Sequence, residues 1–220
     1  MKIWLAAAFA FVCVAGQAAA QNRQIALFGL QERPAALSAG GDTYANRLGR
    51  AVDGLADLFP AGCPRMEARS LAFHDIGDED GLTRAIAQQG SHIYRERLLV
   101  EACAQQYIAN FYIIQAPDQP PSITIGAPGE TIAGLQLQHL AQPQIRQAAG
   151  AKVSCTDDAR IFVVHSEVTQ PPAEVGRAWR ERWTYDACEQ RVEVPIDFIP
   201  DANGVRFDVR AAEARVLPAS

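Results

Sequence analysis

The C-terminal half of the chain alternates apolar and polar side chains with a period of two residues, which is the pattern of β-strands with one buried face. The strands are expected near residues 160–168, 177–187, 191–199 and 205–210. Turn-forming residues separate them, and a tight turn at Glu189-Gln190 pairs the second strand with the third and places Ala187 opposite Val192. One face of this hairpin then carries Trp183 and Tyr185, and we expect a helix to cover it.

A helical stretch precedes the strands in each half of the chain. In the first half, apolar residues recur at steps of three and four, which predicts an amphipathic helix that Asp42 or Thr43 caps and that Pro60 and Gly62 end. Its apolar positions are Tyr44, Leu48, Val52, Leu55 and Phe59. In the second half the pattern is less regular, and Pro143 is expected to break or kink the helix. The apolar positions there are Ile132, Leu135, Leu140, Ile145 and Ala148.

An internal repeat organises these elements. Residues 94–105 match residues 179–190 at a constant offset of 85, and six of the twelve positions are identical. This similarity predicts a tandem duplication with copies at 43–125 and 130–210. The expected fold class is α+β, in which each copy is a helix plus a four-stranded antiparallel meander with one face of the sheet covered.

The N-terminus has the layout of a secretory signal peptide, with Lys2, an apolar stretch and small residues at 18–20. Residues 1–20 are therefore expected to be removed, although a buried N-terminal helix is the alternative. Residues 21–42 and 211–220 are expected to form an N-terminal segment and a C-terminal tail outside the copies. No later apolar run is long enough to span a bilayer, so we expect an exported protein, periplasmic or secreted, with no membrane span.

Four cysteines lie beyond the signal peptide, and an even number of cysteines in an exported chain indicates disulfides. Antiparallel pairing of the first two strands of each copy places Cys63 opposite Cys103 and Cys155 opposite Cys188. One disulfide per copy is therefore expected. No cysteine is then left as a nucleophile, and the absence of C-x-x-C argues against a zinc site.

Charge and composition narrow the classes of function. The chain has 20 Lys+Arg and 25 Asp+Glu, a net charge of −5, which argues against a nucleic-acid partner. Its 49% hydrophobic content is that of a folded domain. The sequence has no phosphate loop, dinucleotide fingerprint or common hydrolase motif, so no cofactor is expected.

The stretch Trp179-Arg180-Glu181-Arg182-Trp183 is followed by Cys188, Val192-Glu193-Val194 and Pro200-Asp201. This W-x-E-x-W…C pattern resembles one that recurs in uncharacterised exported bacterial proteins. The resemblance implies export and a compact sheet, and it brings no activity with it.

Glu96 and Glu181 are the candidate catalytic residues. They occupy equivalent positions of the repeat and are expected on the apolar face, where an unpaired carboxylate is costly and its pKa rises. Two carboxylates about 5–10 Å apart across one cleft would suit a glycan hydrolase. The structural alternative is that each accepts hydrogen bonds from an arginine or from a helix N-terminus.

Other polar residues also recur between the copies. His74 and His165 occupy matching places, but no second ligand lies at a recognisable spacing, so no metal site is expected. Four arginines are candidates for binding an anionic ligand or partner, with pairing to acidic residues across the sheet as the alternative. They are Arg95, Arg97, Arg180 and Arg182. The acidic run Asp78-Glu79-Asp80 is expected in a solvated loop.

These observations favour an exported, disulfide-stabilised, non-enzymatic binding or scaffold protein of the bacterial cell envelope. Its partner would be an envelope protein or another envelope component. Two alternatives stand beside this hypothesis: a glycan hydrolase that uses Glu96 and Glu181, and a small-molecule carrier with an apolar pocket between helices and sheets.

Overall fold

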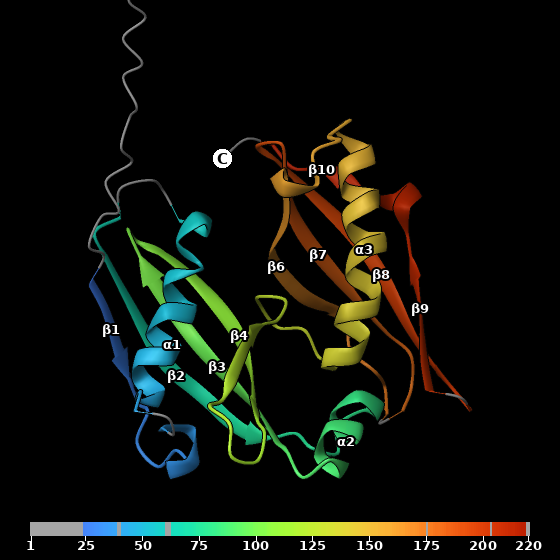
Figure 1. Cartoon of the computed structure of the whole chain (residues 1–220). Helices are drawn as coiled ribbons and strands as arrows, with labels where there is room; N and C mark the ends of the chain where they lie inside the picture. Colours follow the sequence, from blue (N-terminus) through green and yellow to red (C-terminus); the bar gives the residue numbers. More distant parts are fainter. Residues whose placement is uncertain (1–23, 39–40, 60–62, 175, 203, 219–220) are drawn as a thin grey trace, which may run out of the picture.

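The computed structural model describes residues 24–38, 41–59, 63–174, 176–202 and 204–218, and the expected signal peptide lies outside them. Two five-stranded sheets stand side by side, and a long helix lies against one face of each (Figure 1). The α+β class and the two disulfides are confirmed.

The first half builds its core between one helix and one sheet. Helix α1 (Tyr44–Asp53) packs on a sheet of order β1-β2-β3-β4-β5, in which β1 is parallel to β2 and all other pairs are antiparallel. The strands are β1 (Gln24–Phe28), β2 (Arg65–Asp75), β3 (His92–Ala102), β4 (Gln105–Gln115) and β5 (Ser122–Ile125). Helix α2 (Gly81–Gln88) connects β2 to β3, and the short 3-10 helices are η1 (Ala35–Ser38) and η2 (Ala56–Leu58).

The second half also has one α-helix followed by four strands that pair antiparallel. Helix α3 (Leu135–Lys152) covers a sheet of order β10-β8-β7-β6, and β9 pairs with a different part of β8. The strands are β6 (Ile161–Gln170), β7 (Trp179–Ala187), β8 (Gln190–Asp201), β9 (Gly204–Val209) and β10 (Arg215–Val216). The short helices are η3 (Asp158–Arg160) and η4 (Ala211–Glu213).

Besides the short 3-10 helices, two strands and one α-helix were not expected. Strand β1 comes from the N-terminal segment, and β10 comes from the C-terminal tail. Helix α2 begins directly after the acidic run that was expected in a loop. Asp80 is its N-cap and accepts a hydrogen bond from the Thr83 backbone N–H at 2.8 Å, while the Thr83 hydroxyl accepts one from the Asp80 backbone.

The β7–β8 turn corrects the expected register. The turn residues are Cys188 and Glu189, both with positive φ, and the pairing places Tyr185 rather than Ala187 opposite Val192. Positive φ at both positions is the signature of a type I′ turn, whose twist matches that of the strands. The error is a shift of two residues, which leaves each side chain on its expected face. Trp183 and Tyr185 are therefore buried as predicted.

The helices also differ from expectation at their ends and faces. Thr43 caps α1 through a 3.2 Å hydrogen bond from the Asn46 backbone N–H, but α1 ends at Asp53, before the expected stop. Helix α3 runs through Pro143, which lies on its exposed face. Its buried positions are Gln138, Ala141, Ile145, Ala149 and Gly150, whereas Leu140 is exposed and Ile132 precedes the helix. Small residues on this face let α3 lie close to its sheet.

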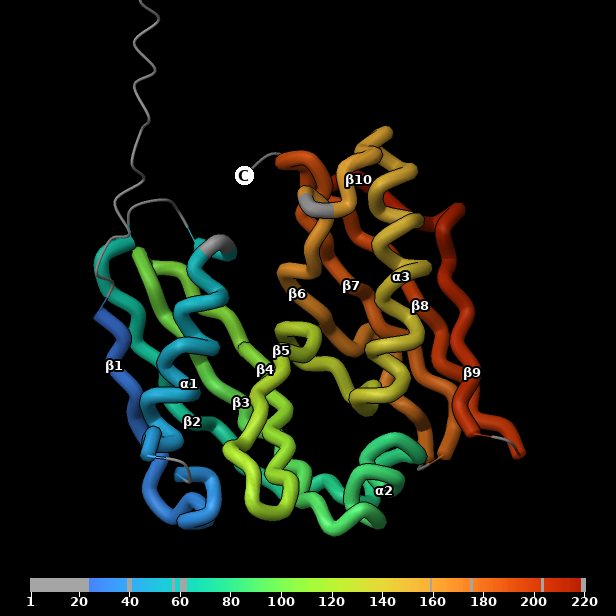
Figure 2. Tube along the Cα trace, in the orientation of Figure 1, coloured from blue at the N-terminus to red at the C-terminus, as the bar shows by residue number. Residues whose placement is uncertain are grey.

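The linker between β5 and α3 runs between the two halves (Figure 2), and hydrogen bonds at this linker fix the halves against each other. The Gly129 N–H donates to the Ile108 carbonyl at 2.7 Å, and the Glu130 N–H donates to the Ser166 carbonyl at 2.7 Å. The linker therefore bonds to β4 on one side and to β6 on the other. A side chain at Gly129 has no room, since a Cβ there would lie 2.1 Å from the Ser166 carbonyl oxygen.

Two side chains extend this junction. The Gln138 side chain, buried on α3, donates to the Tyr112 hydroxyl of β4 at 2.8 Å and accepts from the Ala127 N–H at 2.9 Å. Asp80, the N-cap of α2, also accepts from the Gln136 N–H at the start of α3, at 3.1 Å. One carboxylate thus receives N–H groups from the first turns of two helices, which ties α2 to α3.

Candidate functional site

A cleft of about 380 Å³ lies between the two halves. The first half contributes the end of α1, η2, β4 and β5, and the second contributes α3, β6 and β7. The described lining is mostly apolar, with three polar side chains that reach into it from the second half. The lining includes Leu55, Leu58, Tyr107, Ala109, Ile125, Pro128, Gln142, Arg146, Phe162, Val163 and Tyr185.

Tyr185 lies at the inner wall of this cleft. Its side chain is 1% exposed, and its hydroxyl has no hydrogen-bond partner among the described residues. Burial raises the pKa of the Tyr185 phenol, and the positive charge of Arg146 opposes this shift only in part. The phenol is therefore protonated at neutral pH and is a hydrogen-bond donor without an acceptor.

Arg146 projects from α3 into the same cleft. It is the one charged residue of the described lining, and its Nε is buried with no hydrogen-bond partner. Within the described part of the chain it forms no ion pair with any carboxylate. Neither residue was predicted from the sequence to belong to a functional site. Two features of the sequence could have indicated the site. Arg146 follows Ile145 on an otherwise uncharged stretch of helix, and Tyr185 places a hydroxyl on a strand face that was expected to be fully buried.

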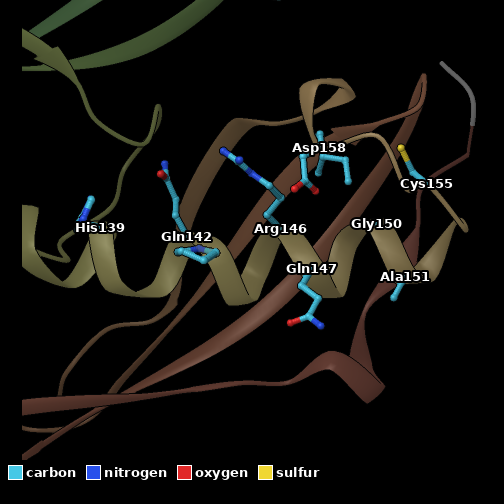
Figure 3. Close-up of a pocket in the computed structure, with 10 residues that line it drawn as sticks. His139, Gln142, Arg146, Gln147, Gly150, Ala151, Cys155 and Asp158 are labelled. Carbon is cyan, nitrogen blue, oxygen red and sulfur yellow. The ribbon is translucent and has the colours of Figure 1, made fainter.

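A second hollow of about 540 Å³ continues along α3 towards its C-terminal end. Gln142 and Arg146 line both hollows, so the two spaces meet at these side chains. Figure 3 shows Gln142 and Arg146 leaving α3 on the same side, while Gly150, Ala151 and Cys155 mark the far end of the hollow.

Glu96, a catalytic candidate, is fully buried in the first half. Arg33 from the N-terminal segment donates hydrogen bonds from Nε and Nη2 to the two carboxylate oxygens of Glu96, each at 2.8 Å. The Tyr44 hydroxyl donates to it at 3.1 Å, and the Ser70 hydroxyl donates as well. The Arg33 guanidinium also lies over the Phe73 ring, 4.4 Å from its centroid. The Glu96 carboxylate thus holds the N-terminal segment against the sheet.

Glu181, the second catalytic candidate, is fully buried in the other sheet. Its carboxylate accepts hydrogen bonds from the Ile132 and Ala133 backbone N–H groups at 3.0 and 3.2 Å, just before α3. The indole N–H groups of Trp179 and Trp183 donate to it at 3.0 and 2.8 Å. Each glutamate is bonded within its own half, and the structure does not bring the pair to one open cleft. These contacts match the structural alternative.

The four candidate arginines are paired with carboxylates on the sheet surfaces. Arg95 pairs with Glu79 at 3.2 Å, and Arg97 pairs with Glu130 at 2.9 Å. In the second sheet, Arg180 forms a two-pronged bond to Asp197, and Arg182 pairs with Glu167 and Glu193. Pairing across the sheet, the alternative expected from the sequence, accounts for Arg180 and Arg182, whereas Arg95 and Arg97 pair with carboxylates of the loop before α2 and of the linker. Arg146 is the arginine of the cleft for which no ion pair is found among the described residues.

His74 and His165 do not occupy equivalent places in the sheets. His74 lies opposite Arg95, whereas His165 lies opposite Thr184, whose counterpart at the offset of 85 is Leu99. The two positions therefore differ by four residues along the paired strand, more than the single residue that a β-bulge inserts. Within the described residues, no group of three potential ligands among His, Cys, Asp and Glu is placed to hold a metal ion.

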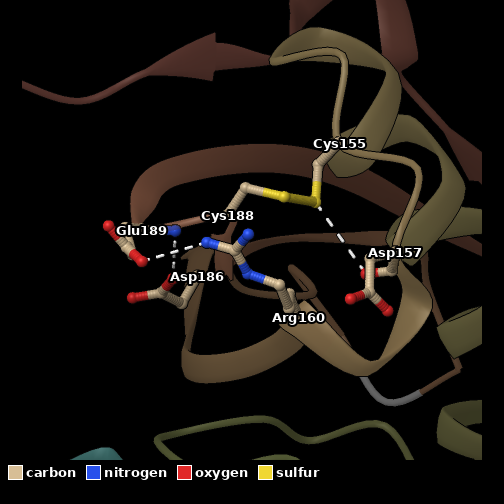
Figure 4. The surroundings of a disulfide bond; sticks show 6 residues. All are labelled: Cys155, Asp157, Arg160, Asp186, Cys188 and Glu189. Atoms are coloured by element: carbon tan, nitrogen blue, oxygen red, sulfur yellow. Dashed lines mark hydrogen bonds and ion pairs between the residues drawn. A yellow bond between two sulfur atoms is a disulfide. The ribbon is translucent and has the colours of Figure 1, made fainter. Parts of the chain in front are cut away.

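The disulfides pair as expected, Cys63 with Cys103 and Cys155 with Cys188. The expected placement of the cysteines was wrong, however, because the two cysteines of each pair do not lie opposite each other on paired strands. Cys188 stands in the β7–β8 turn and Cys155 precedes η3, and ion-paired Arg160 and Glu189 lie beside the bridge (Figure 4). Each disulfide therefore ties a hairpin tip to the segment that leads into the first strand of its meander.

Comparisons with protein-family models, with curated proteins and with solved structures find no match to this chain. In the part of the chain that the structure describes, no helix is both long and apolar enough to cross a membrane. The site therefore has to be interpreted from its own geometry.

Proposed function

We propose that this chain is an exported, non-enzymatic binding protein of the bacterial cell envelope that holds a small, largely apolar molecule between its two halves. The observation that carries the proposal is the cleft of about 380 Å³ with its apolar walls. Its volume lies within the range of about 300–1,000 Å³ that small-molecule sites occupy. Hydrogen bonds at Gly129, Gln138 and Asp80 hold the walls in place, so the cleft is preformed.

Titration with Nile red, a neutral apolar dye, tests the proposal. The variant Ile125→Arg places a charge at a cleft residue that is 41% exposed, so the fold should tolerate it. We expect the full-length mature protein to bind the dye at one site and Ile125→Arg to bind it about tenfold more weakly, because the dye would have to displace a hydrated charge.

Leu140→Arg is the matched control, since Leu140 is 51% exposed on α3 and does not line the cleft. It should bind the dye as the parent does. Absence of dye binding by the parent protein, or equal weakening in both variants, would contradict the proposal.

Two disulfides support the exported location, because such bonds persist in oxidising compartments. Cell fractionation of the full-length chain should recover a processed form outside the cytoplasm. Recovery of only the full-length form in the cytoplasm would contradict export.

The glycan-hydrolase alternative receives no support from the geometry. Fully buried carboxylates whose oxygens already accept several hydrogen bonds do not reach a polysaccharide. The proposed tandem duplication rests on the repeated order of one helix and four antiparallel strands and on the shared disulfide position.

A further inference from the structure

Arg146 and Tyr185 both line the cleft, and each carries one buried polar atom, the Arg146 Nε and the Tyr185 hydroxyl, that has no hydrogen-bond partner among the described residues. Glu96, Glu181 and Gln138 use their side-chain atoms in hydrogen bonds. A buried polar group without a partner is unfavourable, so native structures rarely keep one unless water, an ion or a ligand completes it. Here two such groups line the same space, and the charge of Arg146 acts on the Tyr185 phenol.

We propose that the cleft binds a small carboxylic acid, with its carboxylate on Arg146 and Tyr185. This inference rests on the proposed function and specifies its ligand. A guanidinium binds a carboxylate through two parallel N–H groups, and a protonated phenol supplies a third donor. No acidic residue is among the described lining of the cleft itself. Asp158 lines the adjoining hollow with Arg146 (Figure 3), but the two form no ion pair among the described residues. A single arginine balances one negative charge, which fits a carboxylate better than a doubly charged phosphate.

The walls define the rest of the ligand. Leu58 and Ile125 from the first half face Phe162 and Val163 from the second, so the part beyond the carboxylate is apolar. Gly126 and Pro128 of the linker close one side of the space. The C-terminal carboxylate of a peptide shares this chemistry, but the bounded cleft favours a compact free acid.

Calorimetric titration with matched acids and alcohols tests the inference. The probes are decanoate against decanol and 3-phenylpropanoate against 3-phenylpropanol. We expect the acids to bind about tenfold more tightly than the alcohols, because hydrogen bonds to charged groups are the stronger ones. Arg146→Gln should remove this preference and leave the alcohols unaffected, and Tyr185→Phe should weaken acid binding about threefold. Neither variant removes a side-chain hydrogen bond or an ion pair found among the described residues, so both should fold.

Arg206→Gln is the matched control, since Arg206 is exposed on β9 and does not line the cleft. It should bind acids as the parent does. Equal binding of acids and alcohols, an equal effect of the two arginine variants, or binding of a peptide with a free C-terminus but of neither acid would each overturn the inference. Nile red and alcohol binding without a preference for acids would overturn this inference alone. Failure of every probe would also contradict the proposed function.

Discussion

At the scale of single residues, Glu96 and Glu181 show two ways to hold a carboxylate in an apolar layer. Glu96 receives a guanidinium and two hydroxyls, whereas Glu181 receives only neutral N–H donors. In both sites the carboxylate joins its sheet to a segment outside the meander. For Glu96 this segment is the stretch that carries Arg33, and for Glu181 it is the approach to α3.

Glu96→Gln should lower the free energy of unfolding by about 2–3 kcal/mol, because the Arg33 guanidinium loses its charged partner in a mostly buried site. Urea denaturation measures the change. Glu67→Gln is the control, since the Glu67–Arg65 pair is solvent-exposed and should cost little. Equal losses in the two variants would show that the buried pair has no special role.

Trp183→Ala should destabilise the protein by about 3–5 kcal/mol, since the ring is fully buried and its N–H is a donor to Glu181. Trp179 also donates to Glu181 but is only partly buried, so Trp179→Ala should cost less. Thermal unfolding compares the two variants. A negligible loss for Trp183→Ala would mean that the inward face of β7 is misassigned.

At the scale of elements, each meander is closed by its disulfide. The bridges join residues 40 and 33 positions apart. In the chain-entropy model each contributes about 4 kcal/mol by restricting the unfolded chain. The double variants Cys63→Ala/Cys103→Ala and Cys155→Ala/Cys188→Ala should each lose stability of this order in urea denaturation.

Peptide mapping without reductant provides the companion measurement. It should recover one linked peptide pair from each half. Bridges crossed between the halves, or variants as stable as the parent, would contradict the assignment.

Charge pairing on the outer face of the second sheet makes stability depend on pH. Hydrogen bonds from Arg180, and then from Arg210, hold the pKa of Asp197 below its ordinary value despite partial burial. The pKa of an aspartate in the unfolded chain is about 3.9. Because the pKa of Asp197 is lower in the folded protein, its ionisation stabilises the fold at pH values above about 3.9, and this stabilisation is lost as the pH falls through the folded-state pKa.

Asp197→Asn should therefore be less stable than the parent at pH 7, and the difference should shrink below about pH 4. Denaturation curves across this range measure the difference. Asp208→Asn is the control because Asp208 is half exposed. A difference that does not change with pH would rule out this ionisation as its source.

Local pattern predicted most elements but not their long-range partners. Period-two alternation identified β6 to β9, and the repeat identified their counterparts in the first half. The β7–β8 turn was placed one residue late because Cys188-Glu189 lacks the Asn-Gly or Asp-Gly signal of a type I′ turn. Strand β1 was missed because its parallel pairing with β2 depends on residues far away in the sequence.

At the scale of the whole molecule, the linker decides how the halves meet. The cleft residues Arg146 and Tyr185 were not predictable because their importance depends on this arrangement. Each is ordinary in its own helix or strand, and the approach of the first half forms the cleft in which the Arg146 Nε and the Tyr185 hydroxyl have no partner among the described residues.

Gly129→Ala should severely destabilise the protein, since Gly129 has φ of +100° and the new Cβ would overlap the Ser166 carbonyl. Gly176→Ala is the matched control, with φ of +79° and open space around it, and should cost only about 1–2 kcal/mol. Thermal unfolding of both variants separates steric overlap from backbone strain. Similar losses would mean that the close approach of linker and β6 is not required.

Pro195 has a consequence for self-association. Its carbonyl accepts a hydrogen bond from the Arg210 N–H, and the N and C=O of one strand residue point to the same side. The proline ring therefore stands on the β9 and β10 side of β8, between the stretches that pair with these two strands. This edge of the sheet is consequently formed by two short strands, β9 and β10, and Pro195 of β8 offers no N–H between them. A border of this kind gives a neighbouring molecule no continuous ladder to extend, so this side of the protein is protected against edge-to-edge aggregation.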